Sequence, residues 1–130
     1  MMRPWRVVVI EDDDEVLGLL EVLFELDGRF EVVGTAASGD TGAAMVADLQ
    51  PDVVILDLEL PRVSGLSTLP VLRATAPDTR VVVFSAFADP MTLVDVLQLG
   101  ADDYLDKATT WSELLPTIAA LFEQDTRRTA

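Results

Sequence analysis

Five consecutive carboxylates, at residues 11–15, follow directly on a short apolar run near the start of the chain. Like charges this close repel one another unless a positive charge lies among them. Mg²⁺ in proteins is held by a small number of carboxylates and retains several waters. We therefore predict a divalent-cation site at Glu11 and Asp12. Asp13 and Asp14 are instead suited to the start of a helix, where an acidic side chain accepts free backbone N–H groups.

Three more residues that could do chemistry come at or just after apolar runs farther along the chain: Asp57, Ser85 and Lys107. Lys107 is the only lysine, because the other eight of the nine basic residues are arginines. An ionised carboxylate can attack phosphorus, while a metal ion, a lysine and a hydroxyl hold the oxygens of the transferred group. Together with the acidic pair, these residues predict phosphoryl transfer onto Asp57.

The elements that would position these residues are five short β-branched runs, at 5–10, 30–36, 52–57, 80–85 and 102–106. The first, third and fourth are almost continuously apolar, as in parallel strands covered on both faces. Helical patterns alternate with the runs, which predicts an α/β fold: a doubly wound parallel sheet with helices on both faces. Five strands in this length favour the flavodoxin-like order 2-1-3-4-5. The carboxyl ends of such strands meet at one edge, where ligands bind.

The expected helices carry recognisable boundary signals. Asp89 is expected to cap the fourth helix and Thr110 the fifth. Pro70 and Pro116 both fall inside helical patterns, where proline removes a hydrogen bond. Those two helices therefore either begin later, the first of them capped by Ser67, or are kinked.

Composition narrows the class of protein. Half of the 130 residues are hydrophobic, enough for one domain with a buried core. The formal net charge of −14 disfavours direct binding to nucleic acids or to anionic membrane surfaces. The chain has no cysteine and no histidine, which excludes disulfides and thiolate or imidazole catalysis. No apolar run has the length of a signal peptide or a membrane span, so we expect a cytoplasmic domain.

Four motifs in combination, VVVIEDD, PDVVILDLELPRVSG, VVVFSA and GADDYLDK, resemble the receiver domain of bacterial two-component response regulators, the CheY-like fold. The resemblance covers nearly the whole chain. The stretch at 85–115 is similar to regulators of the NarL/FixJ type, in which a DNA-binding helix-turn-helix domain usually follows the receiver. We expect residues 1–124 to form the receiver and residues 125–130 to be a tail or the start of a linker to an output domain.

By position, the resemblance implies that Asp57 is the phosphoacceptor and that the domain uses Mg²⁺. The ligands of the ion would be Glu11, Asp12, Asp57 and the main-chain carbonyl of Glu59. Lys107 would pair with the phosphoryl group. The phosphodonor would be a histidine kinase acting in trans, and the domain would catalyse only its own phosphorylation and dephosphorylation.

The resemblance also implies a switch. Ser85 would donate a hydrogen bond to the phosphoryl group and Tyr104 would turn inward, which would reshape the surface formed by the last two helices and the strand between them. The result would be control of a homodimer or of an output domain, expected to regulate transcription. Phe87 stands where the family modulates phosphoryl lifetime, and its bulk would slow the attack of water.

Three alternatives compete with this interpretation. A flavin-binding domain of the same architecture would need a loop that accepts phosphate after the first strand, and the carboxylates at 11–15 would repel it. A phosphatase of the haloacid dehalogenase type uses D-x-D, whereas residues 57–59 read DLE. A degenerate receiver would act as a phosphorylation-independent interaction module, and the complete set of site residues argues against it.

Overall fold

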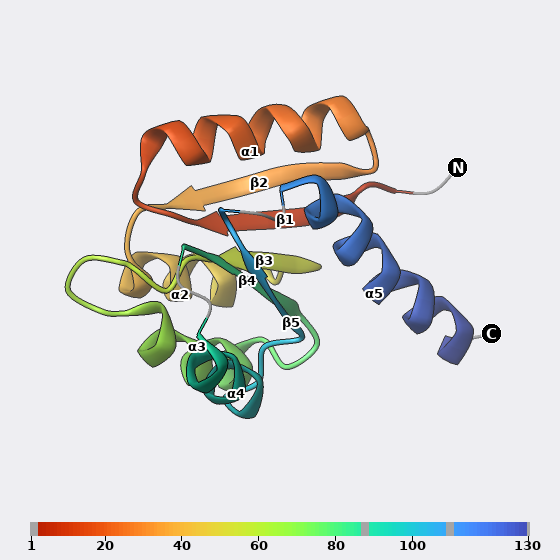
Figure 1. The fold of residues 1–130 in the computed structure, drawn as a ribbon. Coiled ribbons are helices and arrows are strands. Elements are labelled where there is room, and N and C mark those ends of the chain that lie inside the picture. Colours follow the sequence, from red (N-terminus) through yellow and green to blue (C-terminus); the bar gives the residue numbers. More distant parts are fainter. Residues whose placement is uncertain (1–2, 87–88, 109–110, 130) are drawn as a thin grey trace.

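The computed structural model describes residues 3–86, 89–108 and 111–129, with side chains described as far as Glu123. Its parallel strands form one sheet in the order β2-β1-β3-β4-β5, with helices on both faces (Figure 1). The strands are β1 (Trp5–Ile10), β2 (Phe30–Ala36), β3 (Val53–Leu56), β4 (Arg80–Ser85) and β5 (Asp103–Asp106). The helices are α1 (Asp14–Asp27), α2 (Gly39–Leu49), α3 (Gly65–Thr75), α4 (Pro90–Gln98), the 3₁₀ turn η1 (Trp111–Glu113) and α5 (Leu114–Thr129). The predicted fold and strand order are confirmed.

The sheet separates two hydrophobic cores, because successive residues of a strand point to opposite faces. Strand β3 is buried throughout, and β1 and β4 are buried except for their first two residues and first residue, respectively. On one face α2, α3 and α4 pack through residues that include Leu72 and Val96. On the other face α1 and α5 pack through residues that include Phe24 and Ile118. Cover on both faces explains the continuous apolar runs and leaves the strand ends for polar chemistry.

The predicted caps of α1 and α4 are confirmed. The side chain of Asp13 accepts hydrogen bonds from the N–H groups of Glu15 and Val16, at 2.9 and 3.3 Å, at the start of α1. The side chain of Asp89 accepts from the N–H of Thr92 at 2.9 Å at the start of α4. Each aspartate thus satisfies backbone donors that the helix itself leaves without partners.

The two prolines inside helical patterns are accommodated differently. The cap of α3 is Ser64, which accepts from the N–H of Ser67 at 3.2 Å, so the alternative in which the helix begins later, capped by Ser67, is wrong. The helix begins at Gly65, and Pro70 lies inside it. The other helix, α5, does begin late, at Leu114 after η1. Pro116 consequently lies in its first turn, where a missing N–H costs no helical bond.

The last helix continues beyond the boundary predicted at residue 124. It runs to Thr129, so residues 125–129, predicted as a tail or the start of a linker to an output domain, are helical. The division of the chain into a receiver and a tail or linker stays a prediction. The cap predicted at Thr110 lies outside the described residues. In the part of the chain that the structure describes, no helix, α5 included, is long and apolar enough to cross a bilayer.

The loop from β3 to α3 passes so close to the end of β3 that one position requires glycine. The N–H of Gly65 donates to the carbonyl of Leu58 at 3.0 Å. A Cβ atom at Gly65 would overlap the carbonyl oxygen of Asp57 and would lie 2.6 Å from Leu58 Cα. These are backbone atoms, which cannot rotate away as the end of a flexible side chain can. Gly65 therefore allows the loop to pack against the backbone that carries Asp57.

We expect Gly65→Ala to destabilise the fold, because the added methyl group would force the loop away from the end of β3. Overpacking of this kind costs about 1–3 kcal/mol in the free energy of unfolding, which urea denaturation would measure. Gly18→Ala is the matched control, since Gly18 lies in α1 and an added Cβ would meet no atom within 4 Å. That substitution should stabilise the chain by about 0.5–1 kcal/mol. Similar effects of the two substitutions would contradict the close approach at Gly65.

Candidate functional site

Four strands deliver the predicted site residues to one edge of the sheet. Glu11 follows β1, Asp57 follows β3, Ser85 ends β4 and Lys107 follows β5. Backbone hydrogen bonds continue the pairing of the strands to this edge. The N–H of Asp57 donates to the carbonyl of Ile10 at 3.0 Å, and the N–H of Lys107 donates to the carbonyl of Ser85 at 2.9 Å. The backbone at the strand ends is therefore fixed by the sheet itself.

The ammonium of Lys107 joins two buried carboxylates. Its Nζ forms ion pairs with Glu11 and with Oδ2 of Asp57, the second at 3.1 Å. Oδ1 of Asp57 accepts from Oγ of Ser85 at 3.1 Å and from the N–H of Glu59 at 3.0 Å. Glu11, Asp57 and Ser85 are exposed by only 3%, 4% and 0%. Both oxygens of Asp57 thus have donors, as the burial of a carboxylate requires.

The balance of charge in this site is negative. Burial raises the pKa of Glu11 to about 7, and the charge of Asp57 acts in the same direction, against hydrogen bonds from Lys107 and Asp13. Burial lowers the pKa of Lys107, but its hydrogen bond with Glu11 and the charge of Asp57 outweigh burial, so the pKa is raised. One ammonium is therefore shared by two carboxylates, and the site has negative charge available for a further cation.

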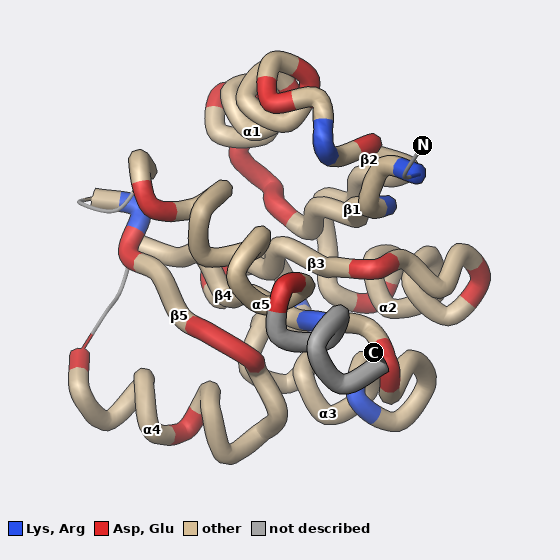
Figure 2. Tube along the Cα trace, turned by 90° about the vertical axis from the view of Figure 1, so that its right-hand side faces the viewer, with Lys and Arg blue, Asp and Glu red and all other residues tan. Residues whose placement is uncertain are grey.

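Glu11, Asp12 and Asp57 could together hold a metal ion. Each offers one carboxylate oxygen, and these oxygens lie within 4.8 Å of one another. Asp12 is exposed while the other two are buried. Glu11 and Asp12 open the acidic run at residues 11–15, and the chain between β1 and α1 is accordingly acidic (Figure 2). Hard oxygen donors with an excess of negative charge fit Mg²⁺, which would keep water in its remaining positions. The ligand role of the Glu59 carbonyl stays a prediction.

Tyr104 lies in β5, opposite Val83 of β4. Its side chain is turned into the core that α2, α3 and α4 cover, with 9% of its surface exposed. Its hydroxyl is buried and has no hydrogen-bond partner among the described residues. Burial, reinforced by the charges of Asp106 and Asp89, raises the pKa of Tyr104 to about 12. A buried hydroxyl without a partner costs stability. The switch role of Tyr104 stays a prediction.

The structure brings most of the predicted site residues into one cluster: Glu11, Asp12, Asp57, Ser85 and Lys107. Phe87 lies outside the described residues. No role was predicted for Gly65 from the sequence. The only feature of the sequence that could have indicated one is its position eight residues after Asp57. The N–H of Glu59 was also missed as a donor to that carboxylate, because the sequence indicates residue types and not the direction of a backbone group.

Comparison with known proteins gives a family. Residues 7–119 match the family model of the response regulator receiver domain. The chain is 38% identical over 119 residues to the transcriptional regulatory protein PrrA of Mycobacterium tuberculosis, which covers 92% of this chain and 50% of that protein. It is 36% identical over 118 residues to a nitrate/nitrite response regulator protein homolog of Haemophilus influenzae, which covers 91% of this chain and 57% of that protein.

A solved structure agrees with these matches. The signal receiver domain of NarL from Mycobacterium tuberculosis has a TM-score of 0.86 and 28% sequence identity, and the match covers 92% of this chain and 97% of that one. The chain spans 31%, 47% and 57% of the length of three curated relatives. The matched residues, the sheet order and the identity to these relatives show that the chain belongs to the receiver domain family of two-component response regulators.

Proposed function

We propose that Asp57 accepts a phosphoryl group from a histidine kinase, with Mg²⁺ held beside it by Glu11 and Asp12. The observation that carries this proposal is the set of donors on Asp57, with Lys107 at Oδ2 and Ser85 at Oδ1. Donors that hold a buried carboxylate are equally suited to the three oxygens of a phosphoryl group. The chain has no histidine, so the phosphohistidine would belong to a partner.

In the transfer, a carboxylate oxygen of Asp57 would attack phosphorus. A new O–P bond forms while the P–N bond of the donor's phosphohistidine breaks, and the imidazole nitrogen keeps the bonding electrons. Mg²⁺, when bound, supplies positive charge that neutralises the transferred group. Lys107 would pass from the carboxylate to a phosphoryl oxygen, and Ser85 would donate to another. The N–H of Glu59 and the close packing at Gly65 keep Asp57 oriented during the attack.

The phosphorylated state would be read on the surface formed by α4, β5 and α5. Met91, Val94 and Leu97 are exposed on α4 at intervals of three residues, which aligns them on one side of the helix. An exposed apolar row of this kind is typical of an interaction surface. We propose homodimerisation through it, and we propose transcriptional output because the relative PrrA is named a transcriptional regulatory protein.

Incubation with acetyl phosphate and Mg²⁺ should add one phosphoryl group to the chain, detected by intact-mass spectrometry. The adduct should be absent without Mg²⁺ and absent in Asp57→Asn. Asp48→Asn is the matched control, because Asp48 is exposed in α2 and its variant should keep the adduct. If neither the adduct nor a beryllofluoride complex forms, the chain is better described as a phosphorylation-independent interaction module.

Mg²⁺ should raise the melting temperature, because it binds the folded acidic cluster and not the unfolded chain. At ten times its Kd the ion would add about 1.4 kcal/mol to the free energy of unfolding. For a domain of this size that corresponds to roughly 5 °C, measured by calorimetry. Asp12→Asn should lose most of the increase, while Asp95→Asn, in the exposed face of α4, should keep it. An equal increase in both variants would place the ion elsewhere.

Tyr104→Phe should leave the free energy of unfolding unchanged or raise it by about 1 kcal/mol at pH 7, because it removes a buried hydroxyl that has no partner among the described residues. Above pH 10 the variant should gain a larger advantage. The unfolded chain then loses the tyrosine proton while the folded chain, with a pKa of about 12, retains it, so wild-type stability falls as pH rises. Urea denaturation at pH 7 and at pH 11 would measure both effects. A clear loss of stability at pH 7 would show that the hydroxyl has a partner.

A further inference from the structure

Strand β2 has a free edge. Within the described residues it pairs only with β1, on one side. The carbonyls of Arg29 and Ala36 face that side, where each accepts a hydrogen bond of 2.9 Å from an N–H in β1 or just after it. Backbone groups of successive residues in a strand point to opposite sides. The N–H and C=O of Phe30 and Thr35 therefore point outward, away from the sheet.

This edge lacks most of the features that protect exposed strands. Such strands are usually short or carry lysine or proline. The other edge of the sheet, β5, follows that rule with the four residues DYLD. In contrast, β2 has seven residues, FEVVGTA, with neither lysine nor proline. Its protective features are the exposed charge of Glu31 and the irregular register with β1 at Val33, which divides the edge into two pairing segments.

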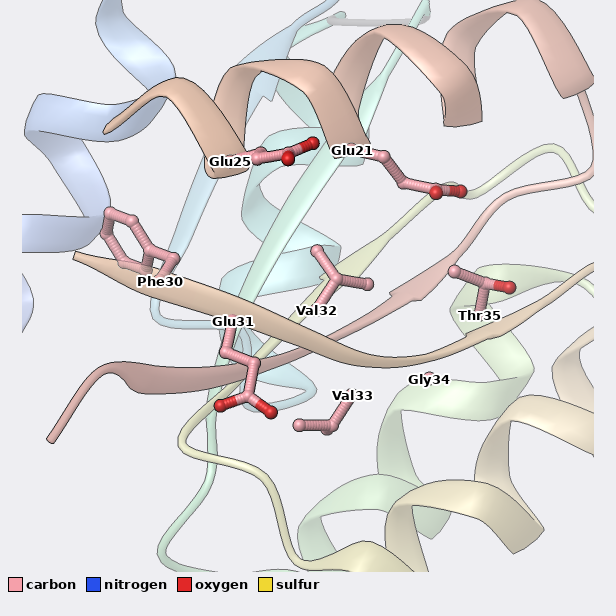
Figure 3. A pocket seen from close by; sticks show the side chains of 8 residues that line it. All are labelled: Glu21, Glu25, Phe30, Glu31, Val32, Val33, Gly34 and Thr35. Atoms are coloured by element: carbon pink, nitrogen blue, oxygen red, sulfur yellow. The ribbon is translucent and has the colours of Figure 1, made fainter. Parts of the chain in front are cut away.

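An open groove of about 500 Å³ follows this edge between α1 and β2 (Figure 3). Glu21 and Glu25 of α1 lie over the strand on the same side as Val32, whereas Glu31 lies on the opposite side of β2 (Figure 3). All three glutamates are exposed. None of the residues that line the groove is basic. Negative charge consequently flanks the free edge on both faces of the sheet.

Charge decides which kind of strand fits. A second copy of β2 would bring its own Glu31 and its own α1 against the same glutamates, in a chain with a net charge of −14. Like charges directly opposite one another destabilise strand pairing. An extended segment with Lys or Arg at alternate positions would pair its backbone with β2 and reach Glu21 and Glu25 with every second side chain.

We propose that the free edge of β2 binds an extended basic segment of a partner protein as a sixth strand of the sheet. Glu21, Glu25 and Glu31 are the charge partners, and the outward backbone groups of β2 supply the hydrogen bonds. No residue that lines the groove belongs to the cluster around Asp57. The proposal therefore does not depend on phosphorylation, and its failure would leave the proposed function untouched.

The test uses a capped ten-residue peptide of alternating lysine and valine, titrated into the ¹⁵N-labelled chain. The buffer contains salt at about 0.15 M, which screens non-specific attraction. Amide shifts should concentrate in β2 and on the side of α1 that faces it. The double variant Glu21→Gln/Glu25→Gln should weaken binding by roughly threefold to tenfold. The matched control Asp48→Asn/Asp95→Asn, which removes the same charge from α2 and α4, should bind as the wild type does.

A second peptide, with the same side chains and every backbone nitrogen methylated, separates strand pairing from simple charge attraction. It keeps the positive charges but has no N–H groups to donate to the edge, so its binding should be weaker by roughly tenfold or more. Equal binding of the two peptides would overturn the proposal. Shifts centred on Glu11 and Asp12 in place of β2, or no binding at millimolar peptide, would overturn it as well.

Discussion

Two buried carboxylates that share one ammonium are the constraint on which the rest of the structure depends. A carboxylate buried without a cation or hydrogen-bond donors would be prohibitively costly. Lys107 meets this requirement for both Glu11 and Asp57, although 50 residues separate it from Asp57. Contacts between residues so distant in sequence form only when β1, β3 and β5 lie parallel in one sheet with their ends at the same edge. The ion pairs that neutralise the buried carboxylates therefore depend on the strand order of the sheet.

Two features near this edge lower the stability of the chain. The pKa of Glu11 is raised mainly by burial, and the buried hydroxyl of Tyr104 has no partner among the described residues. Destabilising features of this kind are concentrated at functional sites. The two apolar cores on either side of the sheet provide the stability that compensates for them. The rest of the sheet follows the ordinary rules of burial.

The order of the strands and the meeting of the acids with the lysine could be predicted from the sequence, because each residue directly follows or ends an apolar run and strand ends share an edge. The start of α3 could not. Pro70 suggests a break, but Leu69 and Leu72 are fully buried, and tertiary packing outweighs the local cost of proline. The Tyr104 hydroxyl has no partner in the part of the chain that the structure describes. Its surroundings and the contact at Gly65 depend on distances between separate segments, and no local pattern encodes them.

The attachment of the charged groups has a consequence for timing. Glu11 and Asp57 are carried on short side chains from strand ends that are hydrogen-bonded to their neighbours, whereas Lys107 reaches them through a flexible four-carbon stem. Its ammonium can change partners by rotation about side-chain bonds, without movement of the backbone. Such rotations are completed within nanoseconds when a side chain is exposed, and collective movements of helices take microseconds to milliseconds. Partial burial slows the rotation of the lysine side chain. The movement of the helices would still be the slower step, and it would set the rate at which a signal from this site reaches the surface.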